Sequence, residues 1–293
     1  MYEKWKGVHT RCAFNMIQEL IPLTRPRTLA ATLGPTILGA AFSYYAFGAA
    51  QGTGLAIFHT VLIFLAVVTA QIVANLWNEY KDFKSGLDAG QKVGNAGSIT
   101  RGVITPELII TMIKVLMFVP IIIGLYLSAT ITWYYIPVGF LCILISFLYS
   151  GGPKPISRTP FGEISSGIAM GFTIVLITGY AWIRELSLAL LIPAIPSTLL
   201  VGSIMLTNNI RDIRNDESHG RHTLPIVLGR ERALSLMSIS YIFNFIWIIA
   251  WIIVGHMTWF ALLAFLAAPL AFKTIRTLST NTDEFQLDKA MGT

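Results

Sequence analysis

The sequence predicts an all-α polytopic membrane protein. Of its 293 residues, 54% are hydrophobic and only 12% are charged, which is far from the composition of a soluble domain of this size. Two long tracts, Thr28–Asn78 and Leu186–Ile210, contain no Asp, Glu, Lys or Arg. An apolar run of about 20 residues has the length of a membrane-spanning helix. The chain is therefore expected to cross a bilayer several times.

Eight transmembrane helices are expected from the apolar tracts. Thr28–Asn78 is long enough for two helices with a turn at Gly48–Gly54, and Val115–Pro153 holds two more with a turn near Ser128–Thr132. The other tracts give one helix in Ile164–Ile183, one in Leu186–Ile210, and two in Ala233–Phe272 with a turn at Gly255 and His256. Residues 1–27 are expected to form a cytoplasmic or interfacial segment, residues 28–276 the transmembrane domain, and residues 277–293 a polar tail.

Nearly all of the positive charge falls on one side of these helices. Among the Lys and Arg residues, only Lys114 and Arg184 lie elsewhere. Because Lys and Arg are enriched in cytoplasmic loops, we expect a multi-pass protein of the cell inner or plasma membrane whose N-terminus faces the cytoplasm. The lipid bilayer and an anionic substrate are partners that suit the net charge of +6. Nucleic acid is not expected as a partner.

Two clusters of acids and amides mark the end of the second helix of each predicted half. The first contains Asn75, Asn78, Asp82 and Asp88, and the second contains Asn208, Asn209, Asp212 and Asp216. Asn78 and Asp82 are one helical turn apart, as are Asn208 and Asp212, so each pair shares a helix face. The repeated pattern indicates two pseudo-repeated four-helix halves around a central cavity. Carboxylate and amide oxygens suit Mg²⁺, which proteins usually hold with few carboxylates plus substrate phosphates, although such residues can also simply mark a membrane boundary.

Two polar loops could hold phosphate. A glycine-rich basic loop, KVGNAGSITRG, covers residues 92–102 after the first cluster. Glycine lets the backbone approach a ligand closely, and backbone N–H groups together with Lys and Arg can hold phosphate oxygens. The turn YSGGPKP at residues 149–155 ends the fourth predicted helix. Lys154 in this turn could either reach a diphosphate or anchor the helix at the cytoplasmic face, and both interpretations stay open.

The two clusters resemble the motifs of the UbiA superfamily of intramembrane prenyltransferases. The resemblance lies in Asn75-x-x-Asn78-Glu79-Tyr80-x-Asp82 with Gly86-x-Asp88, and in Asn208-Asn209-Ile210-Arg211-Asp212-x-x-x-Asp216-x-x-x-Gly220-x-x-Thr223-Leu224. The last acid of the first motif comes at Asp88 instead of Gly86, a longer spacing found in the branch that prenylates 1,4-dihydroxy-2-naphthoate. Glu79 stands where Asp is commoner. The superfamily usually has nine helices, so the chain is expected to stop before a ninth.

The resemblance implies an enzyme that transfers a polyprenyl group from a polyprenyl diphosphate to dihydroxynaphthoate. The reaction would proceed with decarboxylation and pyrophosphate release to give demethylmenaquinone. The resemblance implies Mg²⁺ as the cofactor, bound by the catalytic residues Asp82, Asp88, Asp212 and Asp216, with Asn78 and Asn208 as further ligands. The implied substrate-binding residues are Asn75, Asn78, Lys81, Arg101, Tyr149, Lys154, Asn208, Asn209, Arg211 and Arg221.

Two alternative functions stay open. A UbiA-type enzyme with 4-hydroxybenzoate or homogentisate as the acceptor would need the same diphosphate site. A membrane transporter could also be built from repeats that carry intramembrane polar residues, but its site would lie near the bilayer midplane. The acids of this chain lie at helix ends beside basic loops, which favours the enzyme.

Overall fold

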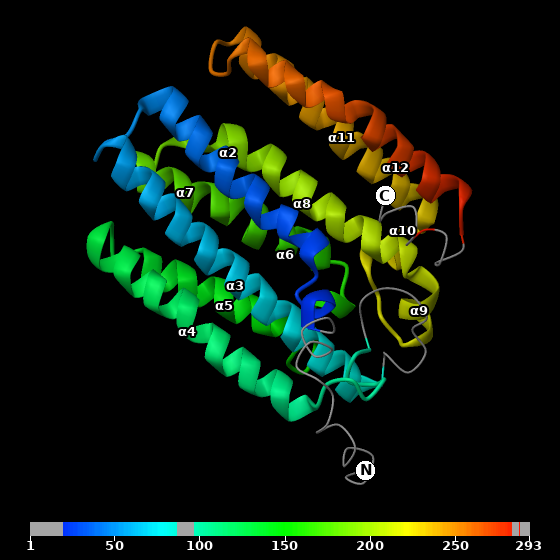
Figure 1. Cartoon of the computed structure of the whole chain (residues 1–293). Helices are drawn as coiled ribbons and strands as arrows, with labels where there is room; N and C mark the ends of the chain where they lie inside the picture. Colours follow the sequence, from blue (N-terminus) through cyan, green and yellow to red (C-terminus); the bar gives the residue numbers. More distant parts are fainter. Residues whose placement is uncertain (1–19, 87–96, 283–286, 288–293) are drawn as a thin grey trace. The chain divides into compact units, whose positions relative to one another are not determined.

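The computed structural model describes residues 20–86, 97–282 and 287, and within these residues all regular structure is helical (Figure 1). The helices pack into two compact units. Unit 1 comprises Met1–Leu33 and Phe58–Pro155, and unit 2 comprises Gly34–Ile57 and Ile156–Thr293. The units do not follow the two halves of the sequence, because most of the first long helix, α2 (Ala30–Phe47), belongs to unit 2.

Among the described residues, six helical segments are long and apolar enough to cross a membrane. They are α3 (Thr53–Ser85), α4 (Pro106–Thr130), α11 (Arg230–Ile253), and the composite segments Gly162–Ile183, Leu188–Arg211 and Trp259–Thr280. A further apolar helix, α5 (Tyr135–Ser150), is shorter, and α2 is a charge-free helix of 18 residues. The expectation of an all-helical polytopic protein is confirmed, whereas the count of eight crossings and the repeat arrangement stay predictions.

The start of α4 differs from the expectation. The charge-free tract begins at Val115, but the helix begins at Pro106 and includes Glu107 and Lys114. The hydroxyl of Thr105 caps this start by accepting a hydrogen bond from the backbone N–H of Leu108 at 3.2 Å. A Thr cap followed by a proline at the first helical position is a favourable helix start. The helix α4 therefore extends beyond its charge-free tract at the N-terminal end, where it includes charged residues.

Unit 1 is built on α3, which is 33 residues long. Val73 and Leu76 of α3 are almost fully buried in an apolar cluster that also contains Ile99 and Ile104. These two isoleucines belong to the chain between residue 97 and the start of α4, so this connection folds back onto α3. The loop is thereby part of the core of unit 1, and its polar residues are held beside the first cluster.

Unit 2 packs its central helices through small residues. The helices α6 (Gly162–Ser166) and α7 (Thr173–Ile183) flank the π-helix η6 (Gly167–Phe172), and this segment lies along α8 (Leu191–Arg211) (Figure 1). A Cβ atom on Gly171 would lie 2.6 Å from the Cα of Thr198, and the Ser197 hydroxyl donates to the Gly171 carbonyl at 3.2 Å. Membrane helices associate through such close contacts, because lipid provides no hydrophobic driving force between them.

The second cluster lies at one end of unit 2, where several helices terminate. Beyond α8 come two short helices, α9 (Ile213–Ser218) and α10 (Leu224–Leu228), followed by α11. The last segment consists of η8 (Trp259–Ala267) and α12 (Ala268–Thr280), and α12 packs beside α11 (Figure 1). Ile210, Met237 and Leu278 share a buried apolar cluster that joins α8, α11 and α12 at this end.

Candidate active site

The helix α3 is longer than is needed to cross a bilayer, and the first cluster lies near its C-terminal end. At 1.5 Å per residue, the 33 residues of α3 extend about 50 Å, whereas a hydrocarbon core is about 30 Å thick. Asn75, Asn78 and Asp82 follow one another at intervals of three and four near the C-terminal end, so they share one face. Asp82 is buried although it lies near the wet end of the helix. Asp88, predicted to complete this cluster, lies outside the described residues.

Glu79 anchors the basic loop to α3. Its side chain is 2% exposed, and Oε1 accepts hydrogen bonds from the backbone N–H groups of Ser98 at 2.6 Å and Ile99 at 3.4 Å. The guanidinium of Arg101 donates to the Ser98 hydroxyl at 3.2 Å. Hydrogen bonds to an ionised carboxylate are about twice as strong as neutral ones. Glu79 thus fixes the loop that carries Arg101, a role that the sequence motif alone did not indicate.

The other predicted residues of unit 1 lie at the same end. The indole N–H of Trp77 donates to the Phe147 carbonyl of α5 at 3.0 Å, so the C-terminal end of α5 lies beside the cluster on α3. Tyr149 is partly buried near this end, and Lys154 is exposed in the turn that follows. The Lys81 ammonium lies 5.4 Å from the centre of the Trp77 ring, a favourable cation–π arrangement. Asn75 donates to a backbone carbonyl of the chain before α2, at 3.1 Å.

The second cluster is organised by two arginine–aspartate pairs. Arg211 donates to both carboxylate oxygens of Asp212, from Nε at 2.7 Å and from Nη2 at 2.8 Å. Arg221 Nη1 lies 3.3 Å from Asp216 Oδ1, and the Asp216 side chain is only 4% exposed. The two pairs are one turn apart, because the Asp216 N–H donates to the Asp212 carbonyl at 2.9 Å. All four predicted residues are therefore brought together in unit 2.

Glu163 joins the second cluster from α6. It is 4% exposed, and its Oε1 accepts a hydrogen bond from the side-chain amide of Asn209 at 2.8 Å. Its other oxygen, Oε2, is buried and has no hydrogen-bond partner among the described residues. Asn208, the predicted metal ligand next to Asn209, is partly buried near the end of α8. Sequence reasoning missed Glu163, although an acid in the first turn of an apolar helix was a signal that could have found it.

Each cluster offers hard oxygen ligands next to positively charged groups. Within either unit, the described residues contain no group of three or more His, Cys, Asp or Glu side chains that could hold a metal ion. The carboxylates and amides of one cluster can thus supply part of a coordination shell, and phosphate oxygens commonly supply other ligands to Mg²⁺. The arginines are suited to phosphate, because the planar guanidinium can donate two parallel hydrogen bonds.

Comparison with known proteins assigns the chain to a family. The model of the UbiA prenyltransferase family matches residues 33–291. The chain belongs to this family. It is 36% identical over 284 residues to the 1,4-dihydroxy-2-naphthoate octaprenyltransferase of Bacillus subtilis, covering 94% of this chain and 87% of that enzyme. The enzyme of the same name from Mycobacterium tuberculosis is 30% identical over 256 residues, covering 85% of this chain and 82% of the relative.

Solved structures share the fold of this UbiA family member. A UbiA homologue from Archaeoglobus fulgidus bound to DMAPP and Mg²⁺ superposes with a TM-score of 0.64 at 18% identity, covering 92% of this chain and 90% of that chain. The apo structure of a UbiA homologue from Aeropyrum pernix K1 gives a TM-score of 0.66 at 20% identity, covering 91% of this chain and 96% of that chain. The expected resemblance to the UbiA superfamily is confirmed.

Proposed function

We propose that the chain transfers a polyprenyl group from a polyprenyl diphosphate to 1,4-dihydroxy-2-naphthoate in menaquinone synthesis. The observation that carries this proposal is the 36% identity, over 94% of the chain, to an enzyme named for this acceptor. The clusters support it, because each combines carboxylate and amide oxygens with positively charged side chains, and these are the groups that a divalent cation and a diphosphate require. The length of the prenyl chain is left open in this proposal.

The donor set of the two clusters fits Mg²⁺. The described candidates are the carboxylates of Asp82, Asp212 and Asp216 and the amide oxygens of Asn78 and Asn208, all of which are hard oxygen ligands. We infer that these residues hold the ion, together with Asp88. When bound, Mg²⁺ would neutralise charge on the diphosphate and make pyrophosphate a better leaving group. The Archaeoglobus homologue solved with DMAPP and Mg²⁺ supports this inference.

The basic residues of the two clusters would act on the leaving group. Lys81, Arg101 and Lys154 of unit 1 and Arg211 and Arg221 of unit 2 can donate hydrogen bonds to phosphate oxygens. These donors would stabilise the negative charge that grows on pyrophosphate as the allylic C–O bond breaks. The C–O electron pair leaves with pyrophosphate.

The acceptor ring completes the reaction by attacking the allylic carbon. The ring of dihydroxynaphthoate forms the new C–C bond, and the carboxylate leaves as carbon dioxide while its electron pair returns to the ring. The product is demethylmenaquinone in its reduced form. Water must be kept from the allylic cation, since it would otherwise capture the prenyl group as an alcohol. The apolar helices that carry the clusters could provide a water-poor surface for the prenyl chain.

We also propose that both clusters and the N-terminus face the cytoplasm, with eight crossings arranged as two repeated halves around a central cavity. The distribution of Lys and Arg supports this orientation. Ser85 and Ser218 are exposed beside the first and second clusters. Cysteines introduced at these positions should react with an impermeant maleimide from the cytoplasmic side only. Reaction of either cysteine from the opposite side would reject this orientation.

Product analysis tests the proposed reaction. Purified protein in detergent would be incubated with Mg²⁺, labelled polyprenyl diphosphates of several lengths, and dihydroxynaphthoate, 4-hydroxybenzoate or homogentisate. We expect mass spectrometry to identify prenylated naphthoquinol as the main product, with one carbon dioxide released per molecule of product. No prenylated product should form in the presence of EDTA. Dominant prenylated 4-hydroxybenzoate would reject the acceptor while keeping prenyl transfer. Absence of any prenylated product would reject the proposed function.

A further inference from the structure

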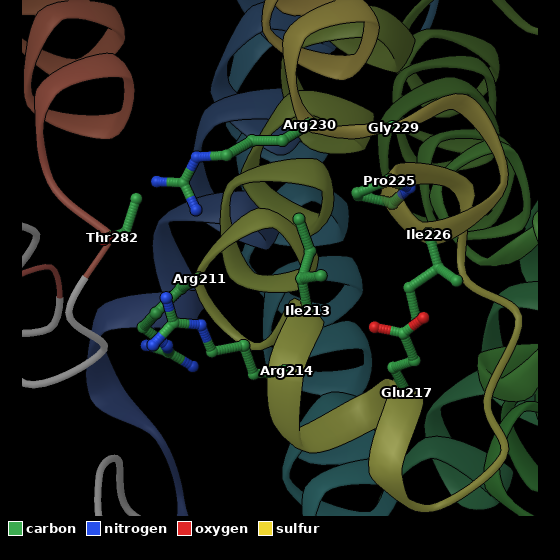
Figure 2. A pocket seen from close by; sticks show the side chains of 9 residues that line it. All are labelled: Arg211, Ile213, Arg214, Glu217, Pro225, Ile226, Gly229, Arg230 and Thr282. Atoms are coloured by element: carbon green, nitrogen blue, oxygen red, sulfur yellow. The ribbon is translucent and has the colours of Figure 1, made fainter.

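A positively charged pocket of about 250 Å³ lies in unit 2, beside the second cluster (Figure 2). It is lined by three arginines, Arg211, Arg214 and Arg230, by a single carboxylate, Glu217, and by apolar and small residues. Figure 2 shows the guanidinium groups of the three arginines on the same side of the pocket. Three cations and one anion in the lining favour the binding of a negatively charged group.

Two of the three arginines are positioned by the protein. Arg211 is held by both oxygens of Asp212, and Arg230 donates to the backbone carbonyls of Leu278, at 2.7 Å, and Asn281 at the C-terminal end of α12. Arg214 is exposed, and its charge lies close enough to that of Arg230 to repel it. An anion between the guanidinium groups would relieve this repulsion. The pocket is therefore preorganised for an anion, since two of its donors are fixed before the anion arrives.

The pocket lies at the level where three candidate membrane segments end. Arg211 is the last residue of the segment Leu188–Arg211, Arg230 is the first residue of α11, and Thr282 lies two residues after the end of Trp259–Thr280. The boundary of the hydrocarbon core is where phospholipid phosphates lie. Ile213 and Ile226 line the same pocket and provide apolar surface next to the arginines.

We propose that this pocket binds the phosphate group of an anionic phospholipid through Arg211, Arg214 and Arg230. Guanidinium groups suit phosphate oxygens because they combine a permanent positive charge with several N–H donors. A water-soluble phosphate would present the same chemistry, but the apolar residues of the lining and the position of the pocket at the ends of three candidate spans favour a lipid. Arg211 also belongs to the substrate-binding residues of the proposed function, whereas Arg214 and Arg230 belong to this pocket alone, so the test is placed on Arg214.

Lipid-dependent stabilisation of the purified full chain tests this site. Dioctanoyl phosphatidylglycerol would be titrated in an uncharged detergent while the thermal aggregation midpoint is recorded, with dioctanoyl phosphatidylcholine and inorganic phosphate as parallel arms. We expect phosphatidylglycerol to raise the midpoint and phosphatidylcholine to leave it unchanged. Arg214→Gln should weaken the apparent affinity about tenfold, which is the loss expected for one charged hydrogen-bonding partner. Glu217→Gln should strengthen it, because it removes the only carboxylate of the lining.

Arg232→Gln is the matched control. Arg232 is exposed on the same turn of α11 as Arg230 but does not line the pocket, so its loss removes the same charge without touching the site. It should leave the lipid response at the wild-type level. Equal weakening by Arg214→Gln and Arg232→Gln would overturn the proposal in favour of general surface attraction. Absence of a response to phosphatidylglycerol, or a response to inorganic phosphate alone, would overturn the lipid assignment.

Discussion

At the scale of single residues, the carboxylates of the candidate active site are already held by donors of the protein. Asp212 and Asp216 are paired with arginines, Glu163 accepts from Asn209, and Glu79 accepts from two backbone N–H groups. A buried carboxylate that lacked such partners would pay a large desolvation penalty. These acids would repel a diphosphate unless a cation lay between them, which is the electrostatic reason for expecting Mg²⁺ in the proposed reaction.

Substitution of Glu79 tests its role in positioning Arg101. Glu79→Ala leaves the fully buried N–H of Ser98 without its acceptor, which costs about 1–3 kcal/mol. We expect the KM for the polyprenyl diphosphate to rise about tenfold or more while the protein still folds, because the loop that carries Arg101 loses its anchor. Glu79→Gln keeps an acceptor oxygen for the Ser98 N–H, so its KM for the polyprenyl diphosphate should stay close to the wild-type value. A wild-type KM in Glu79→Ala would contradict the anchoring role.

The residue contacts show which parts of the site could be predicted from the sequence. The spacing of Asn78, Asp82, Asn208 and Asp212 indicates shared helix faces directly, because one turn of a helix sets that geometry. The hydrogen bond from Ser98 to Glu79 joins residues 19 positions apart and depends on how the loop folds back. The Arg211–Asp212 pair forms because α8 ends at Arg211, whereas sequence neighbours inside a helix do not face each other.

At the scale of elements, the helices of unit 2 are held together by close backbone contacts. Gly167 and Gly171 of η6 allow α8 to approach so closely that a Cβ atom on either glycine would lie 2.6 Å from an atom of the Thr198 backbone. Spacing of small residues by four positions is a common packing device of membrane helices. This contact fixes α6, and with it Glu163, beside Asn209 of α8.

Gly171→Ala tests this packing. The new methyl group would meet backbone atoms of Ser197 and Thr198 that cannot move without separating the two helices, so we expect a loss of about 1–3 kcal/mol in stability. Gly124→Ala in α4 is the matched control, because a Cβ atom there meets nothing within 4 Å. The control should be neutral or stabilising by up to about 1 kcal/mol. Thermal midpoints in detergent that are equal for both variants would rule out the glycine contact as a determinant of packing.

The elements themselves could largely be predicted, because an uncharged tract of bilayer length has few alternatives to a helix. The expected turns near Gly48, Ser128 and Gly255 coincide with helix ends in the structure. The grouping of the helices could not be predicted. Ala40 and Phe42 of α2 are buried with Trp182 and Leu190 of unit 2, and this choice of partners depends on side-chain packing between helices far apart in the sequence.

At the scale of the whole molecule, each packing unit carries one cluster of acids and amides. Unit 1 contributes Asn78 and Asp82, and unit 2 contributes Asn208, Asp212 and Asp216. The central claim of the proposed function, which rests on the two matched sequence motifs, is that the two clusters serve one diphosphate and act as a single site.

A double-mutant cycle of turnover at Asp82 and Asp212 tests this claim most directly. Asp82→Asn and Asp212→Asn each keep the shape of the side chain but remove a charge, and each should lower turnover by about 10²–10³-fold, which corresponds to a loss of about 3–4 kcal/mol of transition-state stabilisation. The double variant should be little worse than either single variant, because residues that act as a unit are not additive. Detergent-extracted yields close to wild type would show that folding is preserved. Near-normal turnover in either well-folded single variant, or fully multiplicative losses in the double variant, would contradict the single site.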